Sequence, residues 1–386
     1  MTFTLNTATP VARVDERFLS FTLDGHTFDG GDTMPFWAPD SRLTRVLAGA
    51  LAPAYLRFGG NSHSTLLYNV TDGPMTPLPP LTPPEYQPPA PKTLMSKAQW
   101  MRILAFGDSA NISILFALND LLRRDGPSGA SVWDSTAASE LINATRSHPS
   151  VSWELANEPD LFHYAFNISD HSIFPVSPEQ LVEDHERLRE LLGPRGFVAG
   201  PDVANSGYSG GRRYWREFWG NVSRSSRRLH SSGRETSPLL NAATWHHYYG
   251  NGKTATTADT HSARVLDSFI TSQQAMATAL RDASAEAHDA APPIWLGETS
   301  SFYGGGAVNI SDRFGAGFTW LDKLGAAARL NVSVVCRQAW MGGSYSLIHY
   351  TSFVPLPDYW ASVLHKRLVG VDVIDVEGSL DPGREV

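Results

Sequence analysis

The sequence predicts an α/β fold of the (β/α)8 TIM-barrel type, and three observations lead to it. Short apolar runs bounded by turn residues alternate eight times with longer helical patterns, as they do in repeated βαβ units. Two of the runs, at 153–158 and 294–298, stop at a glutamate, and acidic side chains at strand ends are typical of the active face of such a barrel. The chain has 386 residues, of which 42% are hydrophobic, whereas a barrel of this type needs only about 250 residues.

The eight strand-like runs are apolar enough to be buried on both faces, as the strands of a parallel sheet are. In chain order they lie at 18–23, 54–58, 112–118, 152–156, 197–200, 242–246, 294–297 and 333–337. Helices are expected between most of them, among others at 41–51, 134–145, 179–192, 263–283, 312–330 and 358–369. The helix after Ser177 has the clearest signals, because Ser177 can cap it, Pro178 suits its first position and Gln180 completes a capping box.

Two stretches interrupt this alternation. Residues 74–92 are dense in proline, which excludes a helix or a central strand. We expect an exposed, extended loop there, with a proline-rich ligand for a partner as the alternative. Residues 223–237 are rich in serine and arginine, and we expect a solvated loop.

The composition narrows the classes of function. The formal net charge of −8 argues against a basic nucleic-acid binder, whereas a polyanionic substrate needs only a local basic cleft. Cys336 is the only cysteine, so no internal disulfide can form, and its apolar surroundings predict a buried small hydrophobe. The 11 Trp and 12 Tyr residues suit sugar-binding platforms, although a large core accounts for most of them.

The two strand-end glutamates, Glu158 and Glu298, suit the cleavage of a glycosidic bond. That reaction needs one neutral carboxylic acid to protonate the leaving oxygen and one ionised carboxylate to attack or stabilise the anomeric carbon. For a single glutamate, a salt-bridged carboxylate at the barrel rim is the simpler explanation. Two glutamates in matching contexts, each with a tryptophan in its strand, favour catalysis.

Longer motifs around these residues resemble the heparanase family, the endo-β-glucuronidases of glycoside hydrolase family 79. Five blocks in the same order carry the resemblance: Tyr-Leu-Arg-Phe-Gly-Gly at 55–60, Trp-Glu-Leu-Ala-Asn-Glu-Pro-Asp at 153–160, Trp-His-His-Tyr-Tyr at 245–249, Trp-Leu-Gly-Glu-Thr-Ser-Ser-Phe-Tyr-Gly-Gly-Gly at 295–306 and Pro-Leu-Pro-Asp-Tyr-Trp at 355–360. The match extends over residues 18–370. It implies that Glu158 is the general acid/base, that Glu298 is the nucleophile, and that the anomeric configuration is retained.

The resemblance also implies roles for residues near the two glutamates. Asn157 would hydrogen-bond the sugar 2-hydroxyl. Arg57 would either orient Glu298 or simply neutralise acids at the rim. His246 and Tyr248 match substrate-site positions of the family, and Tyr248 could also hydrogen-bond the nucleophile. The alternative for His246 is a rim histidine with a purely structural partner.

Further substrate-binding candidates match sugar contacts of the family: Asp24, Asn61, Lys253, Tyr303, Gly304, Gly305 and Tyr345. The glycine run lets backbone N–H groups approach an anion, and in the family this backbone meets the uronic carboxylate. Two positions depart from the family pattern. Asn61 stands where the vertebrate enzyme has threonine, and Lys253 replaces an arginine, which keeps the charge but loses the bidentate fork.

The expected partner is heparan sulfate or a related glycosaminoglycan; hyaluronan, which is unsulfated, would need fewer cations in the cleft. A non-catalytic heparan-sulfate-binding relative is the alternative from another class, and the presence of both glutamates argues against it. No nucleic acid, cofactor or metal is predicted. The adjacent His246 and His247 do not indicate a zinc site, because neighbours on a strand point to opposite faces and cannot both bind one metal in the simple way. No stretch approaches the length of a membrane span, so membrane association is expected only through proteoglycans.

Seven Asn-X-Ser/Thr sequons, together with the resemblance, predict a secreted or lysosomal protein whose leader is absent from this chain. They lie at Asn69, Asn111, Asn143, Asn167, Asn221, Asn309 and Asn331. The resemblance further implies a catalytic barrel over 18–370 and a β-sandwich domain beyond it. We expect 1–17 and 371–386 to be remnant strands of that sandwich, otherwise missing, and the alternating run at 371–376 to be a strand with no later partner.

Overall fold

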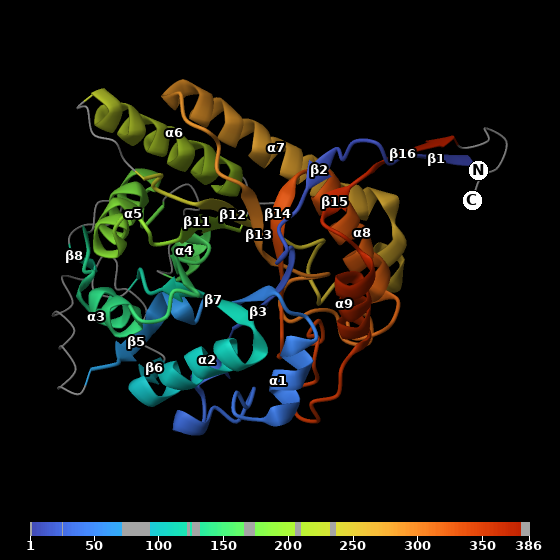
Figure 1. Ribbon diagram of the computed structural model, residues 1–386, viewed down its shortest axis with the longest axis horizontal. Coiled ribbons are helices and arrows are strands. Elements are labelled where there is room, and N and C mark those ends of the chain that lie inside the picture. The colour runs from blue at the N-terminus through green and yellow to red at the C-terminus, as the bar shows by residue number, and fades with distance from the viewer. Residues whose placement is uncertain are drawn as a thin grey trace.

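Eight parallel strands close into a barrel that helices surround (Figure 1). The computed structural model describes residues 2–24, 26–71, 93–121, 124–125, 132–165, 174–204, 210–231 and 237–379. In chain order the barrel strands are β3 (Leu19–Leu23), β4 (Ala54–Phe58), β7 (Ile112–Leu118), β10 (Val151–Leu155), β11 (Val198–Val203), β12 (Ala242–His247), β13 (Ile294–Thr299) and β14 (Val332–Arg337). Each strand pairs with its successor, and β14 pairs with β3. The predicted TIM barrel is confirmed, with all eight strands within a few residues of their expected positions.

Helices follow the strands along the outside of the barrel. They are α1 (Arg42–Gly49), α2 (Lys97–Ala110), α3 (Thr136–Thr145), α4 (Phe162–Ala165), α5 (Pro178–Leu192), α6 (Gly210–Ser231), α7 (Ala263–Ala287), α8 (Ala316–Arg329) and α9 (Pro357–Leu368). Short 3-10 helices lie at η1 (His26–Phe28), η2 (Gly31–Thr33), η3 (His63–Thr65), η4 (Pro159–Leu161) and η5 (Thr257–His261). All six helices expected from the sequence are present.

The interpretation of residues 223–237 as a solvated loop was wrong as far as Ser231, because α6 continues to that residue. Its aromatic side chains, Tyr214, Trp215, Phe218 and Trp219, are buried. Ser223 and Ser225 are buried as well. Serine on the inner face lets the helix pack closely, while the arginines reach solvent on the other. Residues 232–236 lie outside the described part of the chain, as do 72–92, with the proline-rich stretch, and the sequon at Asn167.

The start of α5 follows the sequence signals in part. Ser177 accepts a hydrogen bond from the backbone N–H of Gln180 at 3.1 Å, and Pro178 occupies the first turn. The Gln180 side chain does not return to the cap; its Nε2 donates to Asp184 Oδ1 at 3.1 Å. The expected capping box is therefore only half formed.

Smaller sheets lie outside the barrel. The pairs are β1 (Thr2–Asn6) with β16 (Asp375–Ser379), β2 (Ala12–Arg13) with β15 (Asp372–Val373), β5 (Leu66–Asn69) with β6 (Thr93–Ser96), and β8 (Arg124–Asp125) with β9 (Val132–Trp133). The β1–β16 ribbon extends away from the barrel in Figure 1. The strand expected at 371–376 thus pairs with the N-terminal segment that precedes the barrel.

Two apolar clusters form the core. The larger one fills the space between strands and helices, and the smaller one lies around Tyr55, Leu115, Trp295 and Cys336. Cys336 is fully buried, as predicted. Among the described residues no helix has both the length and the apolar character needed to cross a bilayer.

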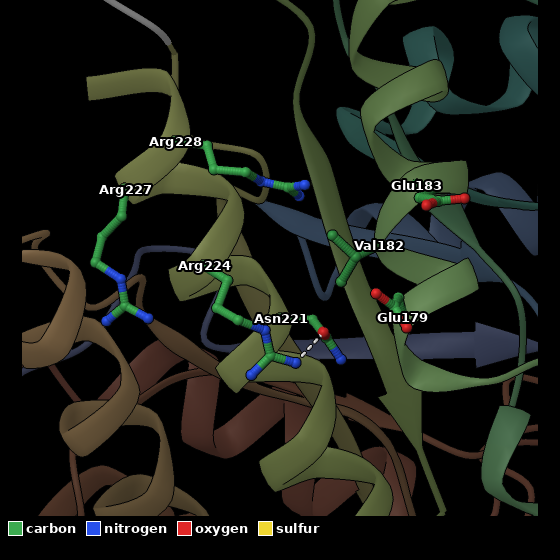
Figure 2. Close-up of a pocket in the computed structure, with 7 residues that line it drawn as sticks. All are labelled: Glu179, Val182, Glu183, Asn221, Arg224, Arg227 and Arg228. Atoms are coloured by element: carbon green, nitrogen blue, oxygen red, sulfur yellow. Dashed lines mark hydrogen bonds between the residues drawn. The ribbon is translucent and has the colours of Figure 1, made fainter. Parts of the chain in front are cut away.

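The outer surface carries two features away from the strand ends. A hollow of about 490 Å³ lies between α5 and α6 (Figure 2), lined by Glu179 and Glu183 of α5 and by Arg224, Arg227 and Arg228 of α6. The Arg227 side chain points away from the two glutamates and pairs with Glu286. The charges of the hollow are mixed, which does not favour a polyanion. Elsewhere, α8 and α9 expose large apolar side chains, namely Phe318, Leu321, Trp360 and Leu364.

Candidate active site

Glu158 lies just past the end of β10, in a strained turn. Ala156 and Glu158 both adopt left-handed backbone conformations, with φ of 77° and 53°, which cost about 1–3 kcal/mol for such residues and are concentrated at functional sites. The turn is held by the Glu158 N–H, which donates to the carbonyl of Asp202 at 3.0 Å. Pro159 then begins η4. The side chain of Glu158 is 17% exposed, so it faces the open end of the barrel.

Glu298 lies within β13 and receives two hydrogen bonds. The Tyr248 hydroxyl donates to Oε1 at 2.6 Å, and Arg57 Nη1 donates to Oε2 at 3.0 Å. Two donors, one of them a cation, hold the carboxylate in one orientation. Burial and the charge of Glu298 raise the pKa of Tyr248 well above its ordinary value, so this phenol stays protonated and remains a donor.

Arg57, at the end of β4, is fully buried and connects four side chains. Nε donates to Glu154 Oε2 at 2.7 Å, and Nη2 donates to Asn157 Oδ1 at 2.9 Å and to Asp202 Oδ2. Burial alone would lower the pKa of Arg57, but the charges of Asp202, Glu154 and Glu298 outweigh it and raise the pKa. The guanidinium therefore both contacts Glu298 and faces other acids, which combines the two roles considered from the sequence.

His246 lies between two carboxylates. Its Nδ1 is 2.9 Å from Glu158 Oε1, and its Nε2 is 2.9 Å from Asp202 Oδ1. Burial would lower the pKa of His246, but the charges of Asp202 and Glu298 raise it well above its ordinary value. These charges favour the protonated imidazole over the neutral one.

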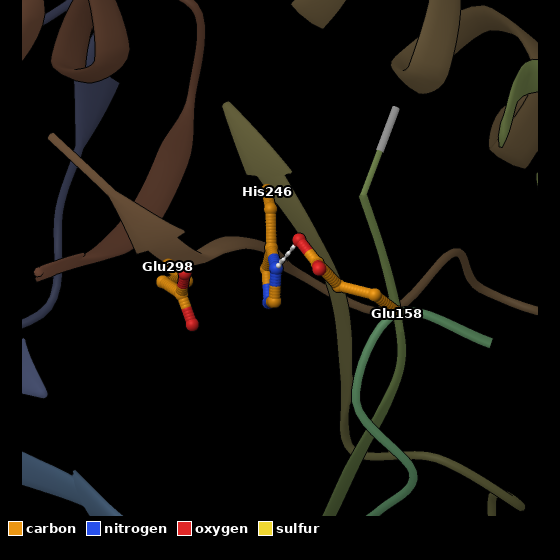
Figure 3. A group of neighbouring side chains, drawn as sticks. All are labelled: Glu158, His246 and Glu298. Carbon is orange, nitrogen blue, oxygen red and sulfur yellow. Dashed lines mark hydrogen bonds and ion pairs between the residues drawn. The ribbon is translucent and has the colours of Figure 1, made fainter. Parts of the chain in front are cut away.

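Glu158, His246 and Glu298 form a compact group at the strand ends (Figure 3). One ligand-type atom from each lies within 4.8 Å of the others, a spacing that a metal ion can also bridge. Within the group, His246 Nδ1 and Glu158 Oε1 lie 2.9 Å apart, at hydrogen-bonding distance.

Two residues of this network, Asp202 and Glu154, did not emerge as site residues from the sequence. Burial raises the pKa of Glu154 to about 8 despite the charge of Arg57, so burial favours the neutral form of this carboxyl. Burial also disfavours the charge on Asp202, but Arg57 and His246 outweigh it and hold the pKa at about 2. Asp202 ends a strand, like Glu158, and the same strand-end rule could have found it. The only sequence signal for Glu154 is that it is an acidic residue inside an apolar run.

The predicted sugar contacts Asn157, Asn61 and Asp24 lie beside this network. Asn157 Nδ2 donates to Asn61 Oδ1 at 3.1 Å, and Asn157 Oδ1 accepts from the Gly60 N–H at 3.0 Å. Asp24 Oδ1 accepts from the Ser62 hydroxyl at 2.8 Å. A Cβ on Gly60 would lie 2.1 Å from the Asp24 carboxyl, so only glycine permits this approach.

The glycine run lies across from the loop that carries Lys253. Gly304, Gly305 and Gly306 all have positive φ. The Gly252 N–H donates to the carbonyl of Tyr303 at 2.9 Å, which brings the exposed Lys253 alongside this run.

Three tyrosine rings pack together beside the two glutamates. The ring of Tyr248 stacks on Tyr345 at 6.3 Å and meets Tyr303 edge-on at 6.4 Å. All thirteen side chains or backbone positions predicted for the site are thereby gathered at the C-terminal end of the barrel strands.

A second buried polar group lies behind β12 and β13. Lys323 Nζ donates to Thr299 Oγ1 at 2.8 Å and to the Ser300 carbonyl at 2.9 Å, and lies 3.2 Å from His247 Nδ1. It also sits 3.9 Å from the centre of the Tyr249 ring. Burial lowers the pKa of both Lys323 and His247 well below their ordinary values. The sequence singled out no role for Lys323.

Known proteins similar to this chain are glycosidases and their relatives, although no protein-family model matches it. The chain is 33% identical over 413 residues to a heparanase from Gallus gallus, covering 95% of this chain and 71% of that protein. It is 29% identical over 407 residues to a hyaluronoglucuronidase from Hirudo nipponia, covering 98% and 75%. It is 28% identical over 281 residues to inactive heparanase-2 from Homo sapiens, covering 71% and 42%.

Solved structures share the fold at lower identity. A 4-O-α-L-rhamnosyl-β-D-glucuronidase from Fusarium oxysporum matches with a TM-score of 0.65 and 17% identity, covering 95% of this chain and 73% of that one. A family 51 α-L-arabinofuranosidase from Bifidobacterium longum matches with a TM-score of 0.62 and 12% identity, covering 98% and 79%. At these identities the likeness concerns the barrel fold alone.

Proposed function

The chain belongs to the heparanase family and is a glycosidase, and from this premise we propose that it is a retaining endo-β-glucuronidase that cleaves heparan sulfate. One observation carries the mechanistic part of the proposal. A carboxylate oxygen of Glu158 and one of Glu298 lie within 4.8 Å of each other. Retaining enzymes hold their two carboxyl groups about 5 Å apart, whereas inverting enzymes leave room for a water molecule between them.

In the first step, Glu298 attacks the anomeric carbon as the glycosidic C–O bond breaks. Glu158 gives its proton to the leaving oxygen, so the products are a sugar ester of Glu298, a Glu158 carboxylate and a shortened chain. The ester removes the negative charge of Glu298, while Arg57 and His246 keep their positive charges. That change favours the new Glu158 carboxylate, whose Oε1 faces His246 at 2.9 Å.

In the second step, the Glu158 carboxylate takes a proton from water, and the oxygen of that water attacks the anomeric carbon. The ester bond breaks, Glu298 leaves as a carboxylate and Glu158 is again protonated. Arg57 and Tyr248 hold Glu298 in one orientation through both steps. Asn157, fixed by Arg57 and Gly60, presents to the sugar the one amide hydrogen that it does not donate to Asn61.

The same chemistry on hyaluronan is the second candidate. A hyaluronoglucuronidase is 29% identical to this chain over 98% of its length. Lys253 also offers a single point charge where the family arginine offers a fork for sulfate. The glycine run would bind a uronic carboxylate in either glycan. A non-catalytic binding role is the weaker alternative, because both glutamates are present and in contact with their expected partners.

The test is a product analysis of heparan sulfate and hyaluronan digested side by side. We expect shorter heparan sulfate fragments with glucuronate at the new reducing end, and little change in hyaluronan. Hexosamine at the new reducing end, or degradation of hyaluronan alone, would contradict the proposal. Glu158→Gln and Glu298→Gln proteins are the controls for contaminating activity.

A further inference from the structure

Four aromatic rings lie in a row on two loops at the active face. The ring of Phe36 lies 5.7 Å from His26 and 5.7 Å from Tyr350, and Tyr350 lies 5.5 Å from His349. The Phe36–Tyr350 and Tyr350–His349 pairs are close to parallel, with interplanar angles of 27° and 20°. At such centroid distances parallel rings are offset. Each ring therefore leaves part of its face uncovered.

The row adjoins the candidate active site. His26 and Phe36 follow β3 and its candidate Asp24, while His349 and Tyr350 follow β14. A Cβ on Gly342 would lie 3.3 Å from the Phe36 ring. The next residue, Gly343, packs directly on Gly305, and the Ser344 N–H donates to the Gly305 carbonyl at 2.6 Å. A short backbone segment thus separates the rings from the glycine run.

Three of the four rings, those of His26, His349 and Tyr350, are exposed, while Phe36 is partly buried against the core. Tyr350 is 50% exposed, and the side chain of His26 is 73% exposed. Tyr345, which belongs to the active site itself, is only 8% exposed. Large apolar surface left open beside a binding site marks a place where a ligand covers it. An aromatic ring offers a sugar an apolar face, and Tyr and His add a polar edge.

We propose that His26, Phe36, His349 and Tyr350 form a stacking platform for a pyranose unit of the bound glycan, beyond the uronic acid whose bond is cleaved. This inference rests on the proposed function, since it assigns a further subsite to the same substrate. The platform contacts no reacting atom. It therefore adds affinity for long chains without changing the chemical step, and it does not depend on sulfate, because it binds the apolar face of a sugar ring.

The test compares a long and a short substrate. The long one is a heparan sulfate decasaccharide, and the short one is a β-glucuronide with a chromogenic leaving group, which reaches only the cleavage site. Tyr350→Ala should raise KM for the decasaccharide by roughly 2- to 12-fold, the value of one aromatic contact. We expect kcat for the decasaccharide and both constants for the short substrate to stay unchanged.

Two matched variants separate stacking from other effects. Tyr350→Phe keeps the ring face and should restore the KM of the unaltered chain. Trp360→Ala removes an equally exposed ring, 56% accessible, from the outer face of α9, and should change nothing. An unchanged KM for the decasaccharide in Tyr350→Ala would overturn the proposal. An equal loss on both substrates would also overturn it, since that result means the ring only supports the loop.

A binding measurement distinguishes failure of the stacking platform from failure of the proposed function. If the unaltered chain cleaves neither substrate, the proposed function fails, and the platform is then tested by calorimetric titration with decasaccharides of heparan sulfate and hyaluronan. The platform predicts weaker binding for Tyr350→Ala than for Trp360→Ala with at least one of them. Equal affinities for both variants and both glycans would refute it.

Discussion

His246 and His247 are neighbours at the end of β12, both are buried, and their surroundings shift their pKa values in opposite directions. His246 lies between Glu158 and Asp202, and its pKa is raised because the charges of Asp202 and Glu298 outweigh burial. His247 lies beside Lys323, and burial together with the Lys323 charge lowers its pKa. Burial alone would lower the pKa of both rings. The difference shows that the face of the strand on which a histidine lies determines which charges it meets. The sign of those charges then decides the direction of its pKa shift.

The two faces also differ in how they stabilise charge. On the inner face, carboxylates and cations balance one another around Arg57. On the outer face, the direct contacts of Lys323 include the neutral groups of Thr299, Ser300, His247 and the Tyr249 ring. Those partners suit the three donors of an ammonium group. The charges of Arg337 and Asp322 shift the pKa of Lys323 in opposite directions. The inner group, around Arg57, is suited to catalysis. The outer group, around Lys323, fixes the segment that follows Glu298.

The largest expected effect is the loss of turnover in Glu298→Gln and Glu158→Gln. Removing a general acid/base costs about 10²–10⁴-fold, and removing a nucleophile costs at least as much. Steady-state rates on a heparan sulfate oligosaccharide measure the effect. Azide should restore turnover to Glu298→Ala and Glu158→Ala with opposite product anomers. Turnover near that of the unaltered chain in either Gln variant would show that the substituted glutamate is not catalytic.

The next effect compares the two histidines directly. His246→Gln removes a charge-assisted contact to Glu158, worth about 1.5–3 kcal/mol, and should lower kcat by roughly 10- to 150-fold. His247→Gln should leave kcat close to that of the unaltered chain and lower the melting temperature instead. Rates and thermal unfolding of both variants test this contrast. Equal losses of kcat would contradict the assignment of His246 to catalysis and of His247 to stability.

Lys323→Met should act mainly on stability. The change leaves Thr299 Oγ1 and the Ser300 carbonyl without their buried donor, at a cost of about 1–3 kcal/mol in the free energy of unfolding. Lys253→Met, at an exposed lysine, is the matched control and should unfold like the unaltered chain. Denaturant unfolding measures both. A Lys323→Met protein of unchanged stability would mean that the outer group holds nothing in place.

Glu154→Gln should flatten the pH dependence of stability. The pKa of Glu154 rises from 4.5 to about 8 on folding. The stability that its protonated form contributes is therefore full below pH 4.5 and is lost as the pH rises through about 8. The slope between these values is at most about 1.4 kcal/mol per pH unit. Glutamine does not titrate, so the variant should lack this loss.

Unfolding at pH 5 and at pH 8 tests this prediction. Glu190→Gln, at an exposed glutamate on α5, should keep the slope of the unaltered chain. If Glu154→Gln shows that same slope, the buried carboxyl does not take up a proton on folding.

The barrel was predictable because its strands are short apolar runs, and such runs are local patterns. Helix α6 was not, because serines such as Ser223 face the core and read as solvated in the sequence. The partner of the strand near 371–376 was also missed, since β1 precedes it by most of the chain. Pairing over such a distance leaves no local signal.

The site was predictable where a motif marks it, as at Glu158 and Glu298. Asp202 and Lys323 lie outside those motifs, and their importance comes from contacts between strands or between a helix and a strand. Such contacts depend on which side chains the closed barrel brings together. Asp202 at least follows the strand-end rule, whereas nothing in the sequence around Lys323 indicates its contacts.

The most direct test of the central claim is to trap the covalent intermediate. A 2-deoxy-2-fluoro β-glucuronide with a good leaving group should inactivate the enzyme and leave one sugar on the protein. Peptide mass spectrometry should place that sugar on Glu298 and on no other residue, and Glu298→Gln should remain unlabelled. A label on Glu158 or elsewhere, or turnover to the inverted anomer with no label, would contradict the account.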